Sequence, residues 1–151
     1  MTAREKKIII AAVVVVVCVP LVFAGVMVGA AVVGYRSAMR AGYEAATIQN
    51  LKTIEAVEAR YFITHNRTFG TLDQLIKEQE LSRKFSGHPA VADGYVFTLS
   101  LALQPNGSSS YKLTADPEPG LSGAHHFYVD SNEDRIRVNP DHQAGPNDPF
   151  N

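Results

Sequence analysis

Apolar and polar positions divide the chain into a long uncharged run, a stretch with helical spacing and several short alternating segments. The uncharged run covers residues 8–34 and would be roughly 40 Å long as a helix, against roughly 30 Å for the hydrocarbon core of a bilayer. It is also about twice as long as the apolar stretch of a signal peptide. We therefore expect a retained transmembrane helix.

The pattern from residue 35 to about residue 65 is that of an amphipathic helix. Apolar side chains recur at steps of three and four residues, at Ile48, Leu51, Ile54, Val57 and Tyr61. We expect Ile54 and Tyr61 to be buried under the rest of the domain. Glu55 and Glu58 share a helix face and are expected to stay solvated or to pair with Arg60.

Short strands follow this helix. Residues 95–99 and 111–115 alternate in polarity around a turn at 105–108, and residues 126–129 and 135–138 flank a second turn. Before them, Thr71 has the form of an N-cap, with Gln74 three residues on.

The predicted fold class is α+β. A long N-terminal transmembrane helix continues as the spine of a head and packs against an antiparallel sheet of three to four strands. The expected divisions are a basic cytoplasmic leader (1–7), the transmembrane helix (8–34), the head (35–138, with its spine helix at 35–65 and its sheet at 94–138) and a flexible tail (139–151).

Charge refines this organisation. The leader carries Arg4, Lys6 and Lys7, which slightly favours a cytoplasmic N-terminus. The chain beyond residue 41 holds nine Lys and Arg against fourteen Asp and Glu. A mildly acidic head argues against nucleic acid as a partner. The single cysteine, Cys18, excludes a disulfide within the head.

Candidate chemistry is sparse. The segment 130–134 has the D-x-N-x-D start of a calcium loop in Asp130, Asn132 and Asp134, but it lacks the glycine and distal glutamate of an EF-hand, and a hairpin turn explains the same residues. We find no catalytic constellation and expect no enzyme and no cofactor, with calcium as the alternative. In the apolar run, Gly25, Gly29 and Gly34 form a small-residue face suited to helix packing.

Five segments in order resemble the type IV pilins and type II secretion pseudopilins. They are residues 45–61, 69–75, 94–98, 111–117 and 123–130, which are similar to that group's spine helix and to its "YGTLADL", "GYxFT", "YxxTAxP" and "GxRxFYxD" segments. The resemblance covers about residues 36–138. The chain lacks the family's Gly-Phe cleavage site and its glutamate inside the apolar helix.

This resemblance implies a structural subunit or accessory of a type IV pilus or a secretion pseudopilus. It implies a single-pass protein of the bacterial inner membrane with a periplasmic head, whose partners are the membrane, other pilin-like subunits and assembly proteins. Major pseudopilins bind calcium in their C-terminal region, so the resemblance also favours the calcium interpretation of the segment that begins at Asp130. The alternative is a non-polymerising, membrane-tethered binding or sensory module with a pilin-like head.

Overall fold

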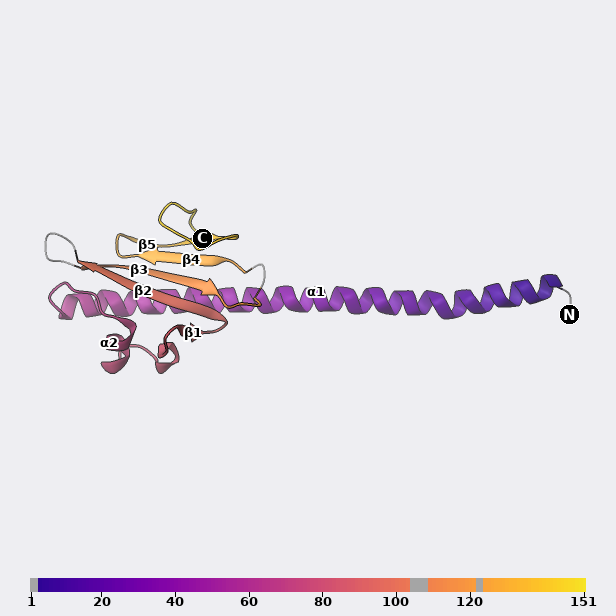
Figure 1. Ribbon diagram of the computed structural model, residues 1–151, viewed down its shortest axis with the longest axis horizontal. Helices are drawn as coiled ribbons and strands as arrows, with labels where there is room; N and C mark the ends of the chain where they lie inside the picture. Colours follow the sequence, from indigo (N-terminus) through magenta and orange to yellow (C-terminus); the bar gives the residue numbers. More distant parts are fainter. Residues whose placement is uncertain (1–2, 104–108, 122–123) are drawn as a thin grey trace. The chain divides into compact units, whose positions relative to one another are not determined.

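The computed structural model describes the backbone of residues 3–103, 109–121 and 124–151, and the side chains of residue 27 and of residues 31 onward within those ranges. The chain forms two compact units, residues 1–39 and residues 40–151. The elements, in chain order, are α1 (Ala3–Thr64), α2 (Leu72–Lys77), the 3-10 helix η1 (Arg83–Phe85), β1 (Ala90–Ala92), β2 (Tyr95–Leu103), β3 (Ser109–Pro117), β4 (His126–Asp130) and β5 (Glu133–Asn139) (Figure 1).

The α+β class is compatible with the structure, but the predicted transmembrane spine is wrong. In the part of the chain that the structure describes, no helix is both long enough and apolar enough to cross a membrane. From residue 31 onward α1 is repeatedly interrupted by charge, first at Arg36, Arg40 and Glu44. Most of the side chains of the run 8–34 lie outside the described residues.

The second unit contains a five-stranded antiparallel sheet, rather than the three to four strands expected, in the order β1-β2-β3-β4-β5. The strand that the sequence analysis missed is β1. It is joined to β2 by Asp93 and Gly94, which both have positive φ (50° and 76°), as a tight two-residue hairpin turn requires. Every strand therefore pairs with its neighbour in the sequence, through short connections where the structure describes them.

The core lies between one face of the sheet and the part of α1 that belongs to the second unit (Figure 1). Alternate residues of β3 point inward, including Tyr111 and Leu113. The helix contributes Leu51, Ile54, Val57 and Tyr61, all buried. The predicted burial of Ile54 and Tyr61 is confirmed.

The region after α1 folds under one edge of the sheet. The predicted capping box of α2 is confirmed, because the Thr71 hydroxyl accepts a hydrogen bond from the Gln74 backbone N–H and the Gln74 side chain accepts one from the Thr71 N–H. Buried Leu75 and Phe85 then pack into the core. The predicted turn at 105–108 lies outside the described residues.

The tail 139–151 was expected to be mobile. Its last four residues, 148–151, contact β5. The Val138 N–H donates to the Pro149 carbonyl, and the Asn151 N–H donates to the Ile136 carbonyl. The Phe150 ring lies against the guanidinium groups of Arg135 and Arg137, at 3.6 and 4.1 Å. These contacts use backbone N–H and carbonyl groups and one aromatic ring, which is why an apolar pattern in the sequence does not reveal them.

Candidate functional site

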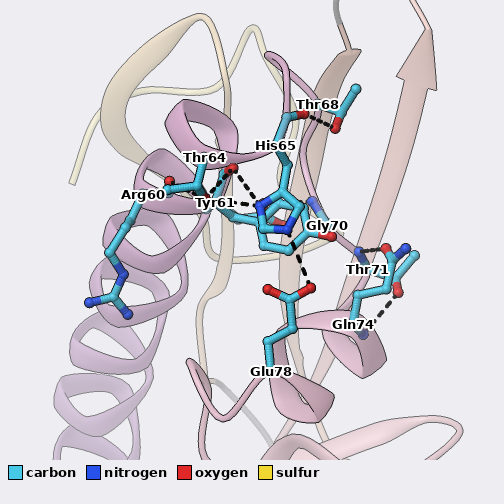
Figure 2. A network of polar contacts seen from close by, with 10 residues as sticks. Arg60, Tyr61, Thr64, His65, Thr68, Gly70, Thr71, Gln74 and Glu78 are labelled. Atoms are coloured by element: carbon cyan, nitrogen blue, oxygen red, sulfur yellow. Dashed lines mark hydrogen bonds and ion pairs between the residues drawn. The ribbon is translucent and has the colours of Figure 1, made fainter.

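The C-terminal end of α1 is held by a polar network (Figure 2). The His65 ring stacks on Tyr61, with ring centroids 3.7 Å apart, and its Nε2 lies 3.4 Å from Glu78. Arg60, expected to meet Glu55 or Glu58, pairs with Glu80 instead. These contacts fasten the last turn of α1 to the segment that carries α2.

Beneath this network lies a buried carboxyl group. Glu58 was expected to be solvated but is fully buried, and its Oε2 accepts a hydrogen bond from the Gly70 N–H at 3.0 Å. Its Oε1 has no hydrogen-bond partner among the described residues. Burial raises the pKa of Glu58 to about 7, although the Gly70 hydrogen bond opposes the shift. The carboxyl group therefore holds its proton up to about neutral pH.

Gly70 permits this arrangement by its lack of a side chain. A Cβ there would lie 2.9 Å from Leu75 Cδ2 and 3.2 Å from Tyr61 Cε1. Because these atoms belong to buried core residues, a larger side chain would push the Gly70 N–H away from Glu58. Close packing thus favours glycine at position 70.

A large hollow lies beside this end of α1. It is a groove of about 830 Å³ between α1 and strands β3, β4 and β5. Its apolar lining includes Phe62, Ile63 and Ile136, and Ile63 is 81% exposed. An apolar wall of this kind can bury the side chains of a partner.

One rim of the groove is acidic. Three carboxylic acids line it, Glu55, Asp130 and Asp134, against a single lysine, Lys52. Burial raises the pKa of Glu55 to about 7, and a hydrogen bond with Asp134 and repulsion by its charge add to that effect. The Glu55 carboxyl group therefore loses its proton as the pH rises through about 7, and the rim gains negative charge.

The weak calcium candidate is explained as a turn. Asp130 Oδ1 accepts hydrogen bonds from the Asn132 and Glu133 N–H groups, at 2.8 and 3.3 Å, and its Oδ2 accepts one from the Tyr128 hydroxyl at 2.8 Å. Asp134 is turned toward Glu55 instead. Among the described residues no group of three or more His, Cys, Asp or Glu side chains is placed to hold a metal ion.

We expect Asp130→Ala to lower the stability of the protein by about 1–3 kcal/mol, because it leaves turn N–H groups and the Tyr128 hydroxyl without their acceptor. Thermal unfolding of the full chain measures this. Asn132→Ala, on the same turn, is the control and should be nearly neutral. The midpoint should be the same in millimolar calcium as in a chelator; a clear rise with calcium would restore the ion-loop interpretation.

The remaining glycines, and two histidines that the structure pairs with carboxylates, are not among the residues that line the groove. Gly25 and Gly29 lie outside the residues whose side-chain surroundings are described, and a Cβ at Gly34 would meet nothing within 4 Å. His125 and His126 each pair with a carboxylate, Glu44 at 3.0 Å and Asp116 at 2.7 Å. Both pairs tie surface segments of the head together.

The groove itself was not predicted. Glu55 and Asp134 are far apart in the sequence, and only the folded β4–β5 hairpin brings them together. The sequence offered only one signal, an acidic residue on the helix and an acidic turn. Acidic residues of this kind are common on protein surfaces and do not by themselves indicate a groove. Comparison with protein-family models, with curated proteins and with solved structures finds no match to this chain.

Proposed function

We propose that the protein is a pilin-like structural subunit or accessory of a type IV pilus or a type II secretion pseudopilus, with its head on the extracytoplasmic side. The resemblance found in the sequence motivates this proposal. The segment 45–61 lies within α1 and supplies buried core residues, and residues 69–75 lead into α2. The later segments fall on β2, β3 and β4.

The observation that carries the proposal is that α1 has apolar side chains both inside and outside the core of the head. The second unit packs its sheet on one face of this helix, with Leu51, Ile54 and Val57 in the core. In the first unit, the described part of the same helix leaves large apolar side chains uncovered, such as Tyr35 and Val33. Unpartnered apolar surface on a helix is typical of a chain that packs against other chains.

The alternative function is a non-polymerising binding or sensory module. The groove beside the end of α1 favours it, because an apolar hollow with a charged rim is the usual form of a binding site. In that case the head would bind its ligand without assembling with other copies.

Cross-linking in intact cells distinguishes the two functions. With an amine-reactive cross-linker, a subunit of an assembly is expected to give a ladder of products containing more than one copy or other pilin-like proteins. Mass spectrometry of the native N-terminus is the second readout, since a clipped and methylated end indicates processing for assembly. A chain recovered only as an intact monomer would contradict the proposal and favour the binding module.

A further inference from the structure

An exposed amphipathic face lies on α1 at residues 32–39. Val32, Tyr35, Arg36 and Met39 follow the spacing i, i+3, i+4 and i+7, so they occupy one side of the helix. All four are exposed, and Tyr35 is exposed to 67%. The face therefore offers three apolar side chains with a guanidinium group among them.

The groove has the complementary character. Its rim carries Glu55, Asp130 and Asp134, and its wall carries Phe62 and Ile63. The groove is also long enough to hold the face. The α1 side of the groove, from residue 52 to residue 63, is about 16 Å long, and the segment 32–39 is about 10 Å long.

We propose that the face 32–39 of one copy of this chain docks into the groove of a second copy, with Arg36 at the acidic rim and the apolar side chains against Phe62 and Ile63. This inference rests on the proposed function and names the interface through which the subunits join. Charge complementarity, and a groove long enough for the face, make a second copy the occupant.

The geometry of this contact has a direct consequence. The face and the groove are different surfaces, so the contact is heterologous: a copy that has docked its face still offers its own groove. Such contacts generate open assemblies unless the rotation between copies closes a ring. A single contact of this size is expected to be weak and to become effective through repetition along an assembly.

Disulfide bridging between two tagged versions of the full chain tests the contact in intact cells. Both versions carry Cys18→Ser, one carries Met39→Cys on the face, and the other carries Ile63→Cys in the groove. The expected result is an oxidised dimer that contains both tags. The background controls are cells that express only one of the two versions.

Two matched substitutions control for position. Ser37→Cys replaces Met39→Cys on the roughly opposite side of the helix. Leu103→Cys replaces Ile63→Cys at a site of equal exposure, 82% against 81%, outside the groove. Either control should reduce the bridged dimer to background. A yield equal to that of the 39–63 pair would overturn the proposal, because it would show unspecific collision.

A charge exchange tests the chemistry of the contact. Arg36→Glu on the face, or Asp134→Arg at the rim, should each lower the bridged yield about three- to tenfold, and the two together should restore it. Failure of the exchange to restore the yield would overturn the placement of Arg36.

The amine-reactive ladder separates the two proposals. If the ladder is present but the 39–63 bridge is absent, the subunits assemble through another surface and only this inference fails. If neither forms, self-assembly fails and this inference fails with it. A bridge from Ile63→Cys to a different protein would also overturn the inference, because the groove would then hold that protein.

Discussion

Replacing Glu58 with glutamine is expected to remove a large part of the pH dependence of stability. Burial raises the folded-state pKa of Glu58 from 4.5 to about 7. The stabilising protonated form is fully present below the unfolded-state pKa, and this contribution is lost as the pH rises through about 7. A shift of this size corresponds to about 3 kcal/mol. The wild type should therefore be less stable at about pH 8 than at about pH 5.

Urea unfolding of the full chain at the two pH values measures this difference. Glu58→Gln keeps an oxygen that can accept the Gly70 N–H, and it has no charge to bury. We expect the variant to lose about 2–3 kcal/mol of the wild-type difference, with a smaller slope remaining from Glu55. Glu118→Gln, at an exposed position, is the control and should behave as the wild type. An unchanged pH slope in Glu58→Gln would show that this carboxyl group is not the source.

The second large effect is expected from Ile54→Ala. Ile54 is fully buried in the core between α1 and the sheet. Removing its side chain beyond Cβ deletes apolar contacts and leaves a cavity, which should lower the free energy of unfolding by about 2–4 kcal/mol. Denaturant unfolding of the full chain, followed by the near-ultraviolet signal of the head tyrosines, measures the change.

The chain offers a matched control for this substitution. Ile63→Ala makes the same change on the same helix, at a side chain that is 81% exposed. Lys52→Ala removes an exposed side chain nearby. Both should be nearly neutral. Equal losses from Ile54→Ala and Ile63→Ala would place the core on the wrong face of α1.

The core-facing part of α1 and the central strands could be predicted because their patterns are periodic. Ile54 and Tyr61 follow the helical spacing of the apolar face, and they are buried. Glu58 was assigned to the solvated side because of its charge, although it lies four residues after Ile54 on the same side of the helix. Its hydrogen-bond donor, the Gly70 N–H, comes from a loop whose path cannot be read from periodicity.

Other features depend on short or polar segments. The strand β1 is only three residues long, and two of them are alanine, which is poor in strands. Asp93-Gly94 was the available signal for its hairpin turn. The groove could not be predicted from the sequence, because its acidic rim combines Glu55 of a helix with Asp134 of a strand far away in the sequence.

The contacts of the tail with β5 decide how the sheet meets other molecules. One outer strand, β5, is covered by residues 149–151, where Arg137 forms a bridge with Phe150. The other, β1, presents only Ala90–Ala92. Long uncovered edges are where foreign strands add and fibrous aggregates start. This sheet is thus protected against growth by strand addition, and displacing residues 149–151 from β5 would expose that edge.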